Sequence, residues 1–490
     1  MTERITGAVL LALIPLMMSA VEPPPPYGAV PSSRQLQWHE LEMYGFLHFS
    51  VNTFTDLEWG NGNEPESVFS PTDFDADQIV GAVKAGGLKG LILTAKHHDG
   101  FCLWPSKFTE HSVKNSPWKG GKGDLVKEIS DACRRHGLQF GVYLSPWDRN
   151  HAEYGRPGYI TYFRNQLREL LTGYGPLFEV WFDGANGGYG YYGGKGGRRG
   201  IDRKSYYDWP TTWQMIRDLQ PGACIWSDAG PDVRWVGNES GRAGDPCWAT
   251  VTADDWCPGK APGNFLYSGM RDGKSWIPAE VDVSIRPGWF YHTNQDARVR
   301  SPENLMKIYF ESVGRGASLL LNIPPDRRGR IHENDAKSLK EFGARLDALF
   351  ACNLAAGATI TASNVRGGDA RFVPANVLDG KRDTYWSTDD GVKTPELVLR
   401  LNKPVTFNVV ALREYLPLGQ RIEGIAIDAK VNGVWKLIGQ ATSIGACRLL
   451  RVPKTMASEV RLRITAAPVC PALAEFGLYR DASGEKGVVK

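Results

Sequence analysis

The amino-acid sequence predicts an α/β protein with a (β/α)8-like barrel followed by a C-terminal β-sandwich. At 490 residues the chain is too long for one compact core. Between residues 40 and 350, short apolar runs alternate with helical stretches, which is typical of a parallel sheet covered on both faces. Beyond residue 352, short strands separated by turn residues follow one another, which indicates a sandwich.

The predicted barrel strands are 44–51, 90–96, 140–146, 177–183 and 224–228, with a further apolar run at 317–324. The predicted helices between and after them are 74–85, 124–136, 158–171, 209–219, 302–313 and 334–350. Residues 230–300 are irregular, so the pattern does not place all eight strands. An open doubly wound sheet is less favoured, because no glycine fingerprint follows the first strand.

The sandwich is predicted from short strands at 359–363, 396–401, 407–412, 424–431, 434–438, 447–452 and 459–465. The expected domain boundaries are therefore a signal peptide at 1–20, the barrel at 21–351 and the sandwich at 352–490. The first segment combines Arg4, an apolar run at 7–14 and a small-residue end at Ser19 and Ala20, as secretory signal peptides do. We expect a secreted or periplasmic protein without a membrane span, because the run is too short to cross a bilayer.

The amino-acid composition narrows the classes of molecule that the protein is expected to bind. The formal charge is +3, from 57 basic and 54 acidic residues, so nucleic acid and anionic membranes are not expected as partners. Eight dispersed cysteines leave two readings open, disulfides such as Cys247–Cys257 and Cys447–Cys470, or buried free thiols. Several of the 16 tryptophans lie beside Asp, Gly or His near predicted strand ends, which favours carbohydrate recognition.

The most informative single position is Asp183. The apolar strand 177–183 ends on this carboxylate and the chain then enters a glycine-rich loop. A buried carboxylate is costly unless its charge is used, and catalytic groups of α/β barrels lie at the carboxyl ends of the strands. The adjacent Trp181 and Phe182 offer apolar walls of the kind that bind sugar rings. We therefore take Asp183 as the first candidate for chemistry.

Other predicted strand ends carry polar or aromatic residues that would converge on the same pocket. They are His48, Glu58, Trp59, His97, His98, Tyr143, Asp228 and Glu239. The His97–His98 pair allows three readings: metal ligands together with Asp183, a buried hydrogen-bonded pair, or donors to substrate hydroxyls. Neighbouring strand residues face opposite ways and no zinc-type spacing is present, so no metal is expected and the third reading is favoured. The glycine-rich loop 184–200 is either a lid or an exposed insertion.

Several of these motifs resemble α-L-fucosidases of glycoside hydrolase family 29. The matching segments, in the family's order along residues 38–350, are 48–50, 94–101, 180–184 and 286–291. Segments 58–60 and 230–239 are similar to the branch that acts on α-1,3/1,4-linked fucose. Segments 375–380 and 383–386 resemble a discoidin-like (factor 5/8 type C) module, which in this branch often packs on the barrel.

The resemblance implies a retaining exo-α-L-fucosidase that needs no cofactor and acts on fucosylated oligosaccharides or glycans. It places the nucleophile on Asp183 and the acid/base on Glu239, with Glu58 and Glu64 as fallbacks for the acid. Such a pair of carboxyl groups must lie about 5–5.5 Å apart and titrate differently. The alternatives that stay open are broader linkage specificity and a non-catalytic glycan-binding protein.

The resemblance also implies the substrate contacts. The residues expected at fucose hydroxyls are His48, His97, His98 and Tyr143, with Glu58 in the same pocket. Those expected around the ring and its methyl group are Trp59, Trp181 and Trp289. Trp147, Asp148 and Asp232 are expected on the side of the leaving group.

Overall fold

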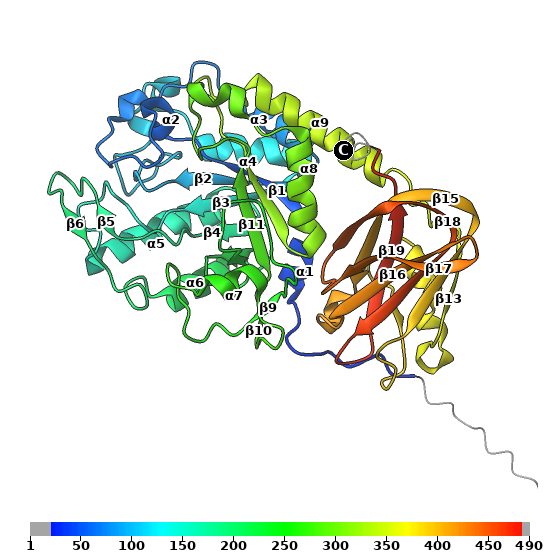
Figure 1. Ribbon diagram of the computed structural model, residues 1–490. Coiled ribbons are helices and arrows are strands. Elements are labelled where there is room, and N and C mark those ends of the chain that lie inside the picture. The colour runs from blue at the N-terminus through cyan, green and yellow to red at the C-terminus, as the bar shows by residue number, and fades with distance from the viewer. Residues whose placement is uncertain (1–20, 483–490) are drawn as a thin grey trace, which may run out of the picture.

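The computed structural model describes residues 21–482 and contains a barrel joined to a C-terminal sheet domain (Figure 1). The predicted signal peptide, residues 1–20, lies outside the described residues. Within them, no helix is both long and apolar enough to cross a membrane.

The barrel consists of eight parallel strands in the order β7-β4-β3-β2-β1-β12-β11-β8. A single parallel bridge from Trp226 to Val233 links the two ends of this order, so the barrel is nearly closed and the predicted fold class is confirmed. The strands are β1 (Met43–Leu47), β2 (Gly90–Lys96), β3 (Gln139–Leu144), β4 (Glu179–Trp181), β7 (Cys224–Trp226), β8 (Arg234–Trp235), β11 (Ala279–Ser284) and β12 (Ser318–Asn322).

Helices surround this barrel (Figure 1). They are α1 (Ser33–His39), α2 (Val51–Thr55), α3 (Ala76–Ala85), α4 (Leu125–His136), α5 (Pro157–Gly173), α6 (Trp209–Leu219), α7 (Gly263–Ser268), α8 (Pro302–Glu311) and α9 (Glu333–Phe350). Their ends follow local chemistry: the Asp75 and Asp124 side chains accept from backbone N–H groups of α3 and α4. On α4, one face buries Val126, Ile129 and Cys133 while charged residues occupy the other.

Two predictions about the barrel were wrong in detail. The strand predicted at 44–51 ends at Leu47, because Ser50 caps α2 by accepting from the Asn52 N–H. The irregular stretch 230–300 supplies the missing strands β8 and β11. Strand β11 was not recognised because Glu280 and Asp282 alternate with its valines, and both carboxyl groups are buried.

The C-terminal domain is an antiparallel sheet folded into two layers. Its strands are β13 (Thr359–Ala362), β14 (Trp386–Ser387), β15 (Glu396–Glu414), β16 (Gly424–Val431), β17 (Val434–Ala441), β18 (Arg448–Ala466) and β19 (Ala472–Tyr479). The predicted pairs 396–401/407–412 and 447–452/459–465 are each one long strand with register shifts in between. The first part of β15 pairs with β13 and the last part with β19, so β15 belongs to both layers.

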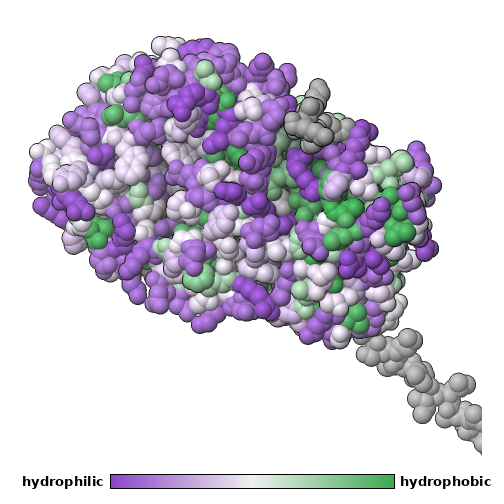
Figure 2. Space-filling view, in the orientation of Figure 1, coloured by the Kyte–Doolittle hydropathy of each residue, from purple (hydrophilic) through white to green (hydrophobic). Residues whose placement is uncertain are grey.

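The two domains share packing. Val409, Ala411 and Leu449 of the sheet domain belong to the same buried cluster as α8 and α9 of the barrel. Arg413 forms an ion pair of 2.7 Å with Glu42 across the junction. In Figure 2 the surface over the barrel helices is mostly hydrophilic, with more apolar side chains over the sheet domain.

Short elements complete the chain. Two small antiparallel sheets have two strands each, β5 (Gly188–Tyr189) with β6 (Arg198–Arg199), and β9 (Thr250–Val251) with β10 (Ser275–Trp276). All eight cysteines, which lie within the described residues, are free thiols, so neither candidate disulfide is formed.

The 3-10 helices are η1 (Glu66–Val68), η2 (Val113–Asn115), η3 (Trp118–Gly121), η4 (Thr293–Arg298), η5 (Val313–Arg315), η6 (Arg366–Gly368), η7 (Ala370–Phe372), η8 (Pro374–Leu378) and η9 (Leu416–Leu418).

Candidate active site

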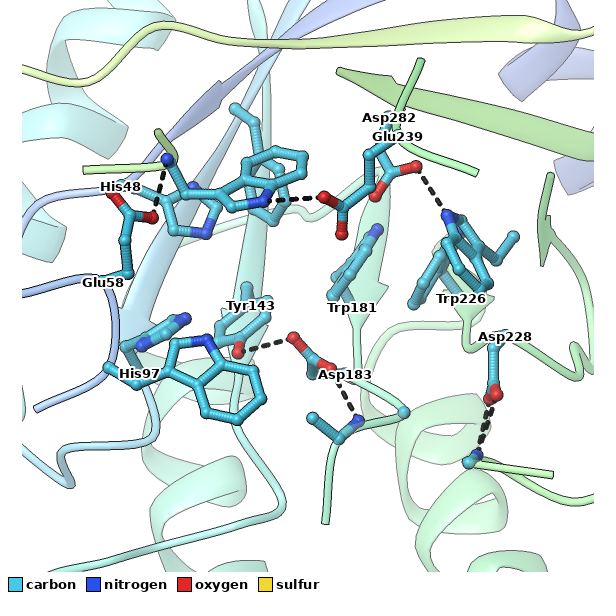
Figure 3. Close-up of a pocket in the computed structure, with 17 residues that line it drawn as sticks. His48, Glu58, His97, Tyr143, Trp181, Asp183, Trp226, Asp228, Glu239 and Asp282 are labelled. Atoms are coloured by element: carbon cyan, nitrogen blue, oxygen red, sulfur yellow. Dashed lines mark hydrogen bonds between the residues drawn. The ribbon is translucent and has the colours of Figure 1, made fainter. Parts of the chain in front are cut away.

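A cavity of about 330 Å³ opens where the barrel strands end at their carboxyl side (Figure 3). It brings together ten of the residues that were predicted from the sequence to lie at the site. They are His48, Glu58, Trp59, His97, Tyr143, Trp181, Asp183, Asp228, Glu239 and Trp289.

Asp183 lies two residues beyond the end of β4 and is half-buried. Its Oδ1 accepts from the Ala185 N–H at 2.7 Å, and its Oδ2 accepts from the Tyr143 hydroxyl at 3.2 Å (Figure 3). Burial raises the pKa of Asp183 to about 6, while these two hydrogen bonds oppose the rise. The carboxylate is therefore ionised at neutral pH and is held from one side by fixed donors.

Glu239 follows β8 in a loop at the mouth of the cavity and is more exposed than Asp183. The Trp289 indole N–H donates to its Oε2 at 3.2 Å. Burial raises the pKa of Glu239, and the charges of Asp183 and Glu58 add to the rise, while the hydrogen bond from Trp289 opposes it. In Figure 3, Asp183 and Glu239 lie on either side of Trp181. Two carboxyl groups in unlike surroundings thus line the same cavity.

The histidines around the cavity are uncharged. Burial lowers the pKa of His48 and of His98 to about 3, and lowers that of His97 well below its usual value. The Nδ1 atom of His48 lies 2.8 Å from Asn322 Oδ1 and so carries the proton, which leaves Nε2 as an acceptor. His98 does not line the cavity: its Nδ1 lies 2.7 Å from Ser145 Oγ and its Nε2 lies 3.6 Å from Asp183.

Aromatic rings form the walls. Trp181 stacks on Trp226 with ring centroids 3.5 Å apart, and the rings of Tyr143 and Phe46 each lie 5.1 Å from that of Trp181. The Trp289 ring lies 5.2 Å from that of His48. Trp59 is half exposed at the rim, where a ligand that extends out of the cavity would meet it.

The two fallback acids are engaged elsewhere. Glu58 accepts from the Trp289 N–H at 2.8 Å and lies 2.6 Å from His292 Nε2, so it fixes the loop that carries Trp289. Gly288 makes this approach possible, since a Cβ atom there would lie 2.2 Å from the Glu58 carboxylate. Glu64 is buried, accepts from the Gly62 N–H at 2.8 Å and does not line the cavity.

The three side chains expected on the leaving-group side, Trp147, Asp148 and Asp232, do not line this cavity. Asp148 is buried and pairs with Lys96 at 3.1 Å. Trp147 is buried and donates to the Tyr192 hydroxyl at 3.1 Å. Asp232 pairs with Arg217 and accepts from the Ile225 N–H at 2.7 Å.

Four further side chains that line the cavity were not singled out from the sequence. They are Phe46, Trp226, Trp235 and Asp282. Asp228, at the end of a predicted strand, accepts from the Gly259 N–H at 2.8 Å, and burial raises its pKa to about 6. The Trp235 indole donates to Asp282 at 2.7 Å, and burial raises the pKa of Asp282 well above its usual value. Of the four residues that were not singled out, only Trp235 lies in a segment with a signal in the sequence, 230–239.

The glycine-rich loop 184–200 packs against neighbouring loops. Its hairpin follows directly from the cavity residues Gly184 and Ala185, and backbone N–H groups of Tyr191 and Tyr192 donate to Asn61 at 3.0 Å and to Arg149 at 2.8 Å. Tyr192, within this loop, is buried. Within residues 21–482 there is no group of three or more His, Cys, Asp or Glu side chains arranged to hold a metal ion.

Comparison with known proteins identifies relatives along nearly the whole chain. Residues 27–348 match the model of the family described as alpha-L-fucosidase, and residues 359–476 match the F5/8 type C domain. Alpha-L-fucosidase 1 of Arabidopsis thaliana is 41% identical over 94% of this chain and 90% of its own length.

Solved structures give the same picture. A putative alpha-L-fucosidase from Bacteroides thetaiotaomicron is 40% identical, with a TM-score of 0.85 over 94% of this chain and 99% of that one. A Ruminococcus gnavus fucosidase of glycoside hydrolase family 29, solved in complex with fucose, is 34% identical, with a TM-score of 0.85 over 94% and 97% of the two chains.

Proposed function

This chain belongs to the α-L-fucosidases of glycoside hydrolase family 29, and we propose that it is a retaining exo-enzyme that removes α-1,3- and α-1,4-linked fucose from Lewis-type oligosaccharides or glycoprotein glycans. The observation that carries the mechanism is the pair formed by Asp183 and Glu239, two carboxyl groups of unlike environment in one cavity. The test is product stereochemistry: NMR during early turnover should detect α-fucose before mutarotation, whereas β-fucose would contradict retention.

In the proposed reaction, Asp183 attacks the anomeric carbon while Glu239 gives its proton to the leaving oxygen. The resulting fucosyl-aspartate ester is then hydrolysed by a water molecule that Glu239 deprotonates. The Tyr143 hydroxyl and the Ala185 N–H hold the Asp183 carboxylate in place at the cavity. Glu239 suits the proton transfer because it lies at the mouth, where a leaving group would depart.

The pocket chemistry supports fucose as the sugar. Uncharged His48 and His97 offer hydrogen-bonding nitrogens to ring hydroxyls without placing a positive charge beside Asp183. Fucose carries an apolar methyl group on C5, which the rings of Trp181 and Trp289 would shield from water. The structure of the Ruminococcus gnavus relative holds fucose itself, which fits the same assignment.

The pH profile follows from the two carboxyl groups. Asp183 must be ionised to attack, so kcat/KM should fall about tenfold per pH unit below a pKa of about 6. Glu239 must hold its proton, so activity should also fall as the pH rises above the raised pKa of Glu239. The measurement is kcat/KM against pH with an aryl fucoside whose leaving group needs acid assistance. An acid limb that persists unchanged in Asp183→Asn would contradict this assignment.

Linkage specificity is inferred from the loop motifs 58–60 and 230–239, which are similar to those of the α-1,3/1,4 branch. We expect Lewis a and Lewis x trisaccharides to be hydrolysed at least about 100-fold faster than 2′-fucosyllactose, a ratio equal to about 2.7 kcal/mol of transition-state binding. The measurement is kcat/KM for each pure oligosaccharide. Equal rates, or the reverse ranking, would favour an enzyme of broader linkage specificity.

A further inference from the structure

Two carboxyl groups lie inside the barrel, where the fold gives them no contact with water. Glu179 on β4 and Glu280 on β11 are both completely buried. The groups that act most strongly on them are each other, Tyr44 and the indoles of Trp38 and Trp181, and none of these is a cation. Two buried carboxylates side by side without a cation would repel strongly.

The pair has four carboxyl oxygens, and three of them accept a hydrogen bond from a neighbouring side chain. The Trp38 indole donates to Glu179 Oε2 at 2.7 Å, and the Trp181 indole donates to Glu280 Oε1 at 2.9 Å. The Tyr44 hydroxyl donates to Glu280 Oε2. The fourth oxygen, Glu179 Oε1, is buried and has no hydrogen-bond partner among the described residues. A buried polar atom is rarely left in this state, and a proton on Glu179 itself would satisfy it.

We propose that Glu179 is an uncharged carboxylic acid that donates from Oε1 to a charged Glu280, and that this acid–carboxylate pair positions Trp181 at the base of the cavity. The electrostatics agree with a proton on Glu179 and a charge on Glu280. Burial raises both pKa values, that of Glu280 to about 7 and that of Glu179 well above its usual value, and the charge of Glu280 adds to the rise at Glu179. At neutral pH the pair thus keeps at least one proton, and that proton is on Glu179.

The pair reaches the reaction site through Trp181. Glu280 holds the indole nitrogen of this residue, while its ring stacks on Trp226 and lies beside Tyr143. Tyr143 in turn donates to Asp183. Glu280 does not line the cavity, so its role is to position other side chains.

Exchanging each acid for its amide tests where the proton is. Glu179→Gln keeps a donor toward Glu280 and an acceptor for Trp38, so kcat and KM should stay within about twofold of the wild type. Glu280→Gln instead presents an NH2 group either to the Trp181 indole, which can only donate, or to the Tyr44 hydroxyl, which must then turn its own proton away from residue 280. We expect KM for an aryl fucoside and the inhibition constant of fucose to rise about tenfold or more, with kcat changed less than about threefold.

A matched control separates positioning from stability. Glu414 is a buried acid of the C-terminal domain whose pKa burial raises to about 7, and it accepts from the Arg421, Ile422 and Gly445 N–H groups. Glu414→Gln should lower the melting temperature and leave KM and fucose inhibition unchanged. A KM increase in this control as large as in Glu280→Gln would overturn the positioning role.

The pH dependence of stability gives a second readout. A raised folded-state pKa means that the folded protein keeps a proton which the unfolded chain releases, so its contribution is lost as the pH rises above the unfolded value near 4.5. The melting temperature of Glu179→Gln relative to wild type should therefore increase by about 2 °C or more from pH 5 to pH 8. Tyr44, Cys224 and Glu280 are the other titratable groups facing Glu179, and the charge of Glu280 also raises the pKa of Asp282; all are retained in this variant.

Three outcomes would overturn the proposal. An equal rise of KM and of the fucose inhibition constant in Glu179→Gln and Glu280→Gln would mean that position 179 needs a charge. An unchanged KM in Glu280→Gln would remove the positioning role. If Glu280→Gln does not fold, the melting temperatures still provide a test. A difference between wild type and Glu179→Gln that stays constant from pH 5 to pH 8 would exclude a proton on Glu179. Only the kinetic readout depends on the proposed function, so a product of inverted configuration would reject the retaining mechanism while the melting comparison stands.

Discussion

Asp183→Asn should lower kcat by at least about three orders of magnitude, which corresponds to about 4 kcal/mol of activation free energy. The amide keeps the shape of the side chain and an acceptor for Ala185 or Tyr143, so the loss would report on the nucleophile and not on the fold. Asp228→Asn is the matched control. Asp228 lines the same cavity, also accepts from a backbone N–H group and has a pKa raised by burial to about 6.

The control should lose at most about tenfold in kcat, because a carboxylate that only contacts substrate contributes a hydrogen bond and not a covalent step. Near-normal turnover by Asp183→Asn would reject Asp183 as the nucleophile, and a larger loss in Asp228→Asn would assign that role to Asp228. Trapping adds a direct observation. With a slow substrate that accumulates the intermediate, mass spectrometry of a digest should find one fucosyl group on the peptide that contains Asp183.

Asp183 could be found from the sequence because its signal is local. An apolar strand ends on it, and in a parallel barrel the end of a strand fixes both the position and the side of the molecule. The same reasoning located His48 after β1 and Tyr143 within β3, since their strands are continuous apolar runs buried on both faces. Where a strand is apolar, the local sequence pattern is therefore enough to locate the site residues at its end.

The pattern fails where the barrel interior is polar. Strand β11 alternates Glu280 and Asp282 with valines, so its hydrophobicity resembles an exposed strand although all six residues are buried. Strand β8 has only two residues and gives no pattern at all. For this reason Asp282 was missed, and Trp235 was not singled out within the segment 230–239, even though both line the cavity.

Position along the chain also does not give the direction of a side chain. Asp148 follows β3 closely, as a site residue would, yet it turns outward to the buried Lys96 side chain. Asp232 lies in a segment that resembles the family motif, and it is held by arginines of α6 and of the segment around α1. Both pairings join residues that are far apart in sequence, and only the folded chain brings them together.

Glu239→Ala should lose activity in proportion to how much the leaving group needs protonation. Substrates with poor leaving groups should lose at least about 100-fold in kcat/KM, and activated aryl fucosides much less. For the activated substrate, azide should restore turnover, because a small anion can enter the space left by the carboxylate and attack the fucosyl-aspartate without a general base. The product should be α-fucosyl azide, since this second displacement restores the original configuration.

Product configuration distinguishes the roles of the two carboxyl groups. In Asp183→Ala azide would replace the nucleophile itself, and a single displacement would give β-fucosyl azide. Glu58→Ala is the control for Glu239, because Glu58 lines the cavity but is occupied by the Trp289 N–H and by His292. Its loss should raise KM by releasing the Trp289 loop, without azide rescue. Rescue at Glu58 and not at Glu239, with α-fucosyl azide as product, would transfer the acid/base role to Glu58, since the configuration shows which displacement azide has entered.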